Sequence, residues 1–327
     1  AAVATGETVL RERPFPGGVL TRVAASHLRV GTFQYFAARG DRAALARLTD
    51  YAIARHYPEA DGPLALLEAV MAAQARLVAQ WMGLGLIHGV MNTDNTAISG
   101  ETIDYGPCAF MDAYHPMQVF SSIDHGGRYA YARQPEILAW NLAQLATALL
   151  PLIDEDTDRA VAQAQAAMNR YPELAQAEWA RVFRAKLGLA AEEEGDAELA
   201  LALLEVMAAQ GADFTNTFRG LADGTAQDWM TDRAPFEAWE ARWRARLARE
   251  PDPEGAPARL AAANPALIPR NHRVEEAISS ALSGSLEPAR RLHAALATPY
   301  ATPRGTDAEL TRPPEDHEVV QATFCGT

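Results

Sequence analysis

Residues 88–107, HGVMNTDNTAISGETIDYGP, gather glycine, asparagine, aspartate and proline into one short stretch. They follow a long apolar segment that opens at Asp61-Gly62-Pro63, and proline suits the first turn of a helix. Leu66, Val70, Ala73, Leu77, Trp81 and Met82 form the stripe of that helix. Loops anchored by buried helices are where functional sites tend to lie. The stretch is therefore the first place to look for chemistry.

The polar residues of this stretch have the spacing of a kinase phosphotransfer site. His88 stands seven positions before Asn95, and Asp104-Tyr105-Gly106 keeps the Asp-aromatic-Gly form. Mg²⁺ is a hard cation that takes oxygen ligands, and an amide carbonyl with a carboxylate suits it. Asn95 and Asp104 are therefore the predicted metal ligands.

One position departs from the kinase pattern. Val90 stands where a kinase carries its catalytic aspartate, and valine accepts no proton. Asp94 lies directly beside Asn95, so its carboxylate can take over as the base. Taken alone, His88 is more often a packed histidine than a catalyst, and Asn-Thr-Asp-Asn is more often a turn. Spacing alone leaves a kinase-like site and an ordinary loop equally open.

Two arginines lie upstream of this stretch. Arg22 and Arg29 flank VAASHL and are seven positions apart. Two guanidinium groups near a hinge can clamp phosphate oxygens. The alternative is a pair of ordinary surface arginines, and the residues by themselves favour that reading.

The composition excludes several classes of protein. The chain has 327 residues and a net charge of -13, which argues against general binding to nucleic acids or anionic membranes. No uninterrupted apolar run approaches the roughly 20 residues of a membrane span. Cys108 and Cys325 are too few for a disulfide scaffold and match no zinc spacing. A reducing cytoplasm is the expected location.

The sequence predicts a short β-hairpin followed by a helical body, an α+β fold. ETVLRERPF and GGVLTRVA have the residues of strands, and PFPGG between them has turn chemistry. The chain opens without an initiator methionine, so we expect a piece whose upstream part is absent. The tail from Ala301 is expected to be irregular. Helices are expected from Phe33, from Pro63, from Pro135, and at about 156–170, 172–188, 196–210, 235–249 and 274–296.

The sequence resembles the selenoprotein O family, a branch of the protein-kinase-like fold, along the whole chain. HGVMNTDN, TIDYGP and DAY carry the resemblance, with support from TGETVLRE, RVAASHLRVGTFQYF, GRYAYARQP, DFTNTFR and NPALIPRN. The resemblance implies three parts. Residues 1–32 end a kinase-like N-lobe with its last hairpin and hinge, residues 33–210 form a helical C-lobe, and residues 211–327 form a helical extension and irregular tail.

The resemblance also implies an activity. Members of the family bind ATP in a flipped orientation and transfer AMP, with Mg²⁺ or Mn²⁺, to Ser, Thr or Tyr hydroxyls of proteins, releasing pyrophosphate. Asp94 matches the proton acceptor, Asn95 and Asp104 match the metal ligands, and Asp104 also belongs to the ATP site. Arg22 and Arg29 match the arginines that hold the terminal phosphate. The expected protein is a bacterial, cytoplasmic protein adenylyltransferase with ATP and proteins as partners, and neither nucleic acid nor membrane.

Two departures from the family limit this expectation. The family's glycine loop, its phosphate-contacting lysine and the acidic partner of that lysine should precede Ala1, so we expect this chain alone to be inactive. Cys325 matches the family's C-terminal cysteine, but its usual partner position falls near Phe120, and Cys108 is no obvious substitute.

Two alternatives to an adenylyltransferase stay open. One is a true kinase, which should keep aspartate at the position of Val90, and the other is a non-catalytic pseudokinase scaffold.

Overall fold

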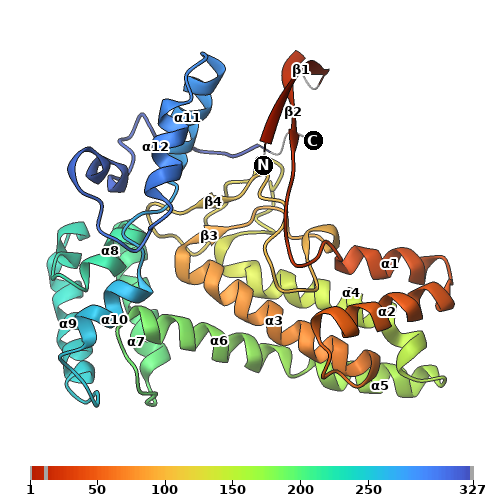
Figure 1. Cartoon of the computed structure of the whole chain (residues 1–327). Helices are drawn as coiled ribbons and strands as arrows, with labels where there is room; N and C mark the ends of the chain where they lie inside the picture. The colour runs from red at the N-terminus through yellow and green to blue at the C-terminus, as the bar shows by residue number, and fades with distance from the viewer. Residues whose placement is uncertain (1, 11–13, 325–327) are drawn as a thin grey trace.

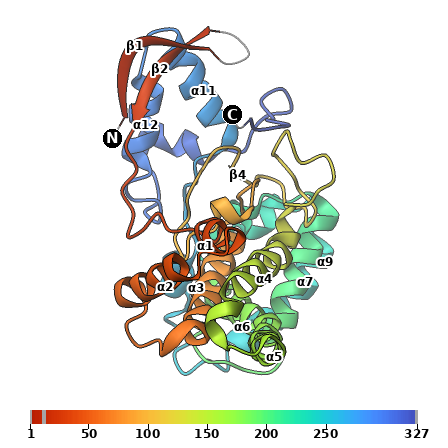
Figure 2. The same ribbon diagram turned by 90° about the vertical axis from the view of Figure 1, so that its right-hand side faces the viewer.

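The computed structural model describes residues 2–10 and 14–324 of the chain. Helices make up most of it, with two small antiparallel strand pairs, so the predicted α+β class is confirmed (Figure 1). One strand pair stands beside α11 (Asn271–Leu282) and α12 (Glu287–Ala295) and apart from the helical body, as the rotated view also shows (Figure 2).

The first strand pair is the expected hairpin, but its turn is not where the sequence predicts it. β1 (Ala2–Leu10) runs antiparallel to β2 (Pro14–Leu20), with Leu10 opposite Pro14. The predicted turn PFPGG was therefore wrong, because it lies inside β2, and the connection falls in residues 11–13, outside the described part. A two-stranded ribbon leaves one edge of each strand without a partner, and proline, which lacks an N–H, is tolerated on such an edge.

The centre of the body is a long helix whose ends are marked in the sequence. α3 (Gly62–Leu84) begins after Asp61 with Pro63 in its first turn, as predicted, and ends at Gly85. Gly85 has a φ of 70°, a left-handed conformation that glycine adopts at little cost. The predicted stripe is buried except for Leu77, which is half-buried. The helix thus delivers the chain from a packed core directly into residues 88–107.

Other helices pack around α3. α2 (Arg42–His56) and α4 (Gln134–Ile153) contact it, α6 (Tyr171–Lys186) runs along it, and α1 (Val30–Ala38) packs on α4 and α2 (Figure 1). The predicted start of α4 near Pro135 is confirmed. The remaining longer elements are α5 (Thr157–Met168), α7 (Asp196–Gln210), α9 (Arg233–Leu247), α11 (Asn271–Leu282), α12 (Glu287–Ala295) and the 3-10 segment η4 (Gly305–Thr311).

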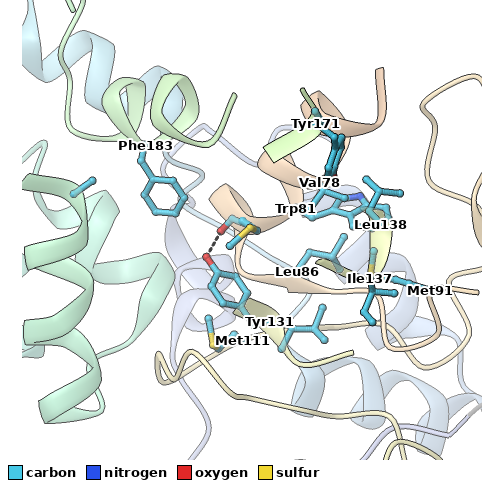
Figure 3. Packing of buried hydrophobic residues seen from close by; sticks show 14 of the residues in the cluster. Val78, Trp81, Leu86, Met91, Met111, Tyr131, Ile137, Leu138, Tyr171 and Phe183 are labelled. Atoms are coloured by element: carbon cyan, nitrogen blue, oxygen red, sulfur yellow. Dashed lines mark hydrogen bonds between the residues drawn. The ribbon is translucent and has the colours of Figure 1, made fainter. Parts of the chain in front are cut away.

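One hydrophobic cluster extends from Val30 to Leu260 and fills the body. Figure 3 shows part of it, where the Tyr131 hydroxyl donates a hydrogen bond of 2.7 Å to the backbone oxygen of Met82. Two helical stretches, Gly62–Leu84 and Tyr131–Ile153, are long and apolar enough to cross a membrane. Half of the first apolar window and 44% of the second are buried inside the protein, which fits the core helices of a folded body.

The C-terminal part differs from the predicted pattern in two ways. The single helix expected at 274–296 is two helices, α11 and α12, because Gly284 has a φ of 95° and reverses the chain between them. Two short helices, α8 (Phe214–Gly220) and α10 (Ala256–Ala263), lie where the apolar pattern predicts none. Asp213 begins α8 by accepting a hydrogen bond from the Asn216 backbone, a capping signal that short helices share with turns.

Lys186 is the only lysine of the chain and is buried in the body. Its Nζ donates a 2.7 Å hydrogen bond to Asn264 Oδ1 and lies 4.1 Å from the ring centroid of Phe218. Burial lowers the pKa of Lys186 from 10.5 to about 7. The folded protein therefore releases this proton at a lower pH than the unfolded chain does.

We expect Lys186→Met to flatten the pH dependence of stability. Because Lys186 is harder to protonate in the folded state, the fold is most stable above pH 10.5, where the lysine is neutral in both states. This advantage is lost as the pH falls from 10.5 to about 7, because only the unfolded chain gains the proton in that range. Between pH 7 and 9 the unfolding free energy of the wild type should fall relative to the variant by about 1.4 kcal/mol per pH unit as pH decreases. Urea unfolding at three pH values measures this slope, and parallel slopes would contradict it. Above pH 7 the lysine is mostly neutral in the folded state, so the lost bond to Asn264 adds a nearly constant offset there and leaves the slope unchanged.

Candidate active site

A pair of two-residue strands closes the ends of the loop formed by residues 88–108, here named the polar loop. β3 (Leu86–Ile87) pairs with β4 (Ala109–Phe110), with Leu86 opposite Phe110. The 21 residues between Ile87 and Ala109 therefore leave and return at neighbouring points, directly after α3. This closure holds both halves of the predicted site, around Asn95 and around Asp104, in one loop.

His88 lies at the base of this loop and joins its two arms. The side chain is fully buried, and its Nε2 is 2.9 Å from the backbone oxygen of Ile103. Burial lowers the pKa of His88, although the Ile103 carbonyl and the charge of Asp104 oppose this. A neutral ring then donates from Nε2, while Nδ1 faces the backbone N–H of Val90 at 3.4 Å. His88 is thus a packed, hydrogen-bonded histidine that holds Ile103 next to Asp104.

Asn95 is oriented by the loop itself. It ends the 3-10 turn η1 (Thr93–Asn95), and its backbone N–H donates to Asn92 Oδ1 at 2.9 Å. Its side-chain Nδ2 donates to the backbone oxygen of Val90 at 3.0 Å. The amide nitrogen is therefore occupied, and Oδ1 takes part in no hydrogen bond recorded among the described residues. An amide held in this way presents its oxygen, the atom that a hard cation binds.

The carboxylate of Asp94 lies against the start of α1. A Cβ placed on Gly31 would be 2.1 Å from Asp94 Oδ1, so only glycine leaves room for the carboxylate there. Arg29, the residue before α1, donates from Nη1 to the backbone oxygen of Asp94 at 3.2 Å. The structure therefore brings together two predicted site residues, Asp94 and Arg29, that are 65 positions apart.

A short backbone ladder maintains this contact. The Val30 N–H donates to the Thr96 oxygen at 3.0 Å, and the Ile98 N–H donates to the Leu28 oxygen at 3.0 Å. Arg29 is the bridge partner of Ala97 between these bonds. The position of the Arg29 backbone is thus fixed relative to the loop.

Arg22 is placed differently from Arg29. It is exposed on the segment between β2 and α1, and no recorded hydrogen bond or ion pair within residues 2–10 and 14–324 fixes its guanidinium group. The structure therefore brings Arg29 to the loop and leaves the side chain of Arg22 unattached to it.

Asp104 has a strained backbone. Its φ is 56°, and it is the one residue other than glycine with a positive φ in the described part of the chain. This conformation costs most residues about 1–2 kcal/mol, Asp and Asn adopt it more readily than others, and residues held in it cluster at active sites. Asp104 is half-buried and lies near Cys108, whose pKa is raised to about 11 by burial and then by the charge of Asp104. Cys108 is consequently a poorly reactive thiol.

The oxygen atoms of Asn95 and Asp104 suit a hard divalent cation, with its other ligands supplied by groups outside the protein. In the described ranges no group of three or more His, Cys, Asp or Glu side chains could hold a metal ion by itself. An amide oxygen from Asn95 and a carboxylate from Asp104 are a typical protein contribution to a site completed by phosphate and water oxygens.

Several residues that hold the loop were not predicted. Asn141 on α4 donates from Nδ2 to the Met91 oxygen at 3.0 Å and to Thr96 Oγ1 at 2.9 Å. Gln74 on α3 donates to the Ala97 oxygen. Both are polar residues within apolar helix faces, and a buried amide at such a position is a signal that sequence reading can use.

The C-terminal tail also reaches this loop. The Thr323 backbone N–H donates to the Phe120 oxygen at 2.7 Å, and its hydroxyl donates to the Pro107 oxygen at 2.5 Å. The resemblance places the partner position of the C-terminal cysteine near Phe120, and the tail does run beside that residue. Cys325 itself lies outside the described residues.

Comparison with known proteins gives consistent matches. The family model described as protein adenylyltransferase SelO matches residues 1–297. The protein nucleotidyltransferase YdiU of Ruegeria sp. (strain TM1040) is 60% identical over 327 residues, which are 100% of this chain and 68% of that protein. The proteins of the same name from Ruegeria pomeroyi and Roseobacter denitrificans are each 58% identical over the same shares of both chains.

These matches define an enzyme of the nucleotidyltransferase class. The chain belongs to the protein adenylyltransferase SelO family. The predicted resemblance to the selenoprotein O family is thereby confirmed.

Proposed function

We propose that this chain carries out protein AMP transfer, moving AMP from ATP to Ser, Thr or Tyr hydroxyls of other proteins with the help of Mg²⁺ or Mn²⁺. The observation that carries the proposal is the contact of Arg29 with the loop: Arg29 Nη1 donates to the backbone oxygen of Asp94, the Asp94 carboxylate lies against Gly31 at the start of α1, and Asn95 is the next residue of the loop. It sets a cation, a carboxylate and a metal-binding amide side by side, which nucleotidyl transfer requires. Membership of the family agrees with this activity.

Each residue has a separate role in the proposed reaction. The acceptor hydroxyl gives its proton to the carboxylate of Asp94, and its oxygen forms a bond to the α-phosphorus of ATP. The bond from that phosphorus to the bridging oxygen breaks, and pyrophosphate leaves. Asn95 and Asp104 would hold the divalent ion, which neutralises phosphate charge when bound. Arg22 and Arg29 hold the terminal phosphates and so present the α-phosphorus to Asp94.

The proposed fold is protein-kinase-like. Residues 1–32 contribute the last hairpin and the hinge of an N-lobe, residues 33–210 form the helical C-lobe, and residues 211–327 form the extension and tail. The separation of β1 and β2 from the helical body supports a first boundary near this position, between β2 and the start of α1 at Val30 (Figure 2). Gly211 ends α7 in a left-handed conformation at the second boundary, and one hydrophobic cluster continues across it. The proposed location is the bacterial cytoplasm, and the relatives reported above come from bacteria.

Val90 is the feature that favours AMP transfer over transfer of the terminal phosphate. Its side chain cannot act as the base of a kinase, and its backbone oxygen serves to orient Asn95. The carboxylate nearest to Asn95 in the sequence is Asp94, which lies within the η1 turn, four positions after the kinase base position at Val90. The base has therefore moved along the loop.

Labelled ATP tests the proposal directly. The complete protein is incubated with protein acceptors, a divalent ion, and ATP labelled either at the α- or at the γ-phosphorus. We expect label from α-³²P-ATP, and not from γ-³²P-ATP, to become attached to protein. The reverse pattern would identify a true kinase. ATP binding in calorimetry without transfer of either label would identify a pseudokinase scaffold.

A further inference from the structure

The segment that carries Arg22 and Arg29 is held at its middle by two side chains with no role so far. Ala25 lies three residues after Arg22 and four before Arg29. Its backbone N–H donates to both carboxylate oxygens of Glu101, at 3.2 and 3.1 Å. Its backbone oxygen accepts from Arg55 Nε at 3.1 Å and from Arg55 Nη2 at 2.7 Å. Both backbone polar groups of Ala25 are thus bound by charged side chains.

These two side chains come from different elements. Glu101 belongs to the polar loop and lies three positions before Asp104, whereas Arg55 belongs to the last turn of α2. Hydrogen bonds to charged groups are stronger than neutral ones. The pair therefore ties the extended segment both to the loop that holds the proposed metal ligands and to the helical body.

Glu101 is itself fixed and ionised. Its Oε2 accepts a 2.9 Å hydrogen bond from the Ser99 hydroxyl. Burial acts to raise the pKa of Glu101, but the hydrogen bonds from Ser99 and from the backbone N–H groups of Ala25 and Ser26 outweigh it and lower the pKa. The carboxylate therefore keeps its charge at neutral pH and holds a defined direction toward Ala25.

The segment needs such support because little else shapes it. It has no helix or strand between Leu20, the last residue of β2, and Leu28, whose backbone oxygen accepts from the Ile98 N–H. Arg22 is exposed, and its neighbour Val23 is 91% exposed. An extended chain that orders only on binding loses affinity, and a chain ordered in advance avoids that loss.

We propose that Glu101 and Arg55 act as a clasp, positioning residues that fix the segment so that Arg22 and Arg29 meet the terminal phosphates of ATP. The inference rests on the proposed function, in which those arginines bind the terminal phosphates. The clasp then sets affinity for the triphosphate end of the nucleotide and leaves the adenosine end unaffected.

The ratio of the dissociation constants for ATP and AMP tests this role. AMP has no terminal phosphates, so loss of the clasp should weaken ATP binding and spare AMP. In the complete protein we expect Glu101→Ala to weaken ATP by about tenfold, the effect of losing one hydrogen bond to a charged group, with AMP changed less than about twofold. Glu101→Gln keeps an acceptor oxygen and should restore part of the ATP affinity. Calorimetry with each nucleotide and Mg²⁺ gives both constants.

Matched variants separate positioning from general damage. Arg55→Ala should reproduce the change in the ATP to AMP ratio, whereas Arg47→Ala, an exposed arginine of the same helix, should not. Glu59→Ala, at an exposed glutamate just beyond α2, is the control for Glu101. Adding Glu101→Ala to a variant that already lacks both arginines of the segment should cause no further loss of ATP affinity.

The outcomes distinguish this inference from the proposed function. Normal ATP binding and AMP transfer by the wild type, with an unchanged ratio in Glu101→Ala and Arg55→Ala, would overturn the clasp alone. Equal weakening of ATP and AMP would show that Glu101 supports the fold and not the arginines, and would also overturn it. A wild-type protein that neither binds ATP nor transfers AMP would overturn the proposed function and this inference with it.

Discussion

Asp104→Ala should reduce AMP transfer by at least about a thousandfold while the protein stays folded. The proposed carboxylate ligand is lost, and with it several kcal/mol of charge stabilisation, each 1.4 kcal/mol of which is tenfold in rate. Transfer from α-labelled ATP measures the loss. Asp50→Ala, at an exposed aspartate of α2, is the control and should keep wild-type activity.

The backbone conformation of Asp104 allows a second test with a different substitution at the same position. Because its φ is 56°, glycine at this position relieves strain, and Asp104→Gly should not lower the melting temperature although it is inactive. Stability without activity is the signature of a residue kept for function. An active Asp104→Ala variant would contradict a role as metal ligand, and a lowered melting temperature in Asp104→Gly would contradict the strain inferred from its φ.

Gly31→Ala should lower the rate of AMP transfer by about a hundredfold without loss of ATP affinity. Alanine favours a helix over glycine by about 0.5–1 kcal/mol, so the exchange should not unfold α1. Its Cβ, however, would lie 2.1 Å from Asp94 Oδ1, and the carboxylate must move. A misplacement of about 1 Å in a reacting group can cost about a hundredfold.

Comparison with Asp94→Ala completes this test. Removing the base should cost about 10²–10⁴ in rate, and Gly31→Ala should approach that loss while ATP still binds. Gly126→Ala is the matched control, because a Cβ there meets no atom within 4 Å. Wild-type rates in both Gly31→Ala and Asp94→Ala would remove Asp94 from the role of base.

Much of the local structure can be read from the chain. Asp61, Pro63 and Gly85 mark both ends of α3, and the apolar stripe between them predicts its buried face. The polar loop, the opening hairpin and the helical body are predicted correctly, and so are the family and the class of reaction. The failures are local too: PFPGG has the composition of a turn but lies in a strand, and Gly284 divides a helix that the apolar pattern continues.

The sequence by itself determined the elements, because helix caps, apolar periodicity and left-handed glycines act between residues a few positions apart. It also supplied the residue types of the site, an amide and two carboxylates in one loop. Only the tertiary structure decided which groups meet: Arg29 with Asp94, 65 positions away, and Ala25 with Glu101, 76 positions away. Such contacts depend on how separate elements pack against a common core, and no local pattern encodes that packing.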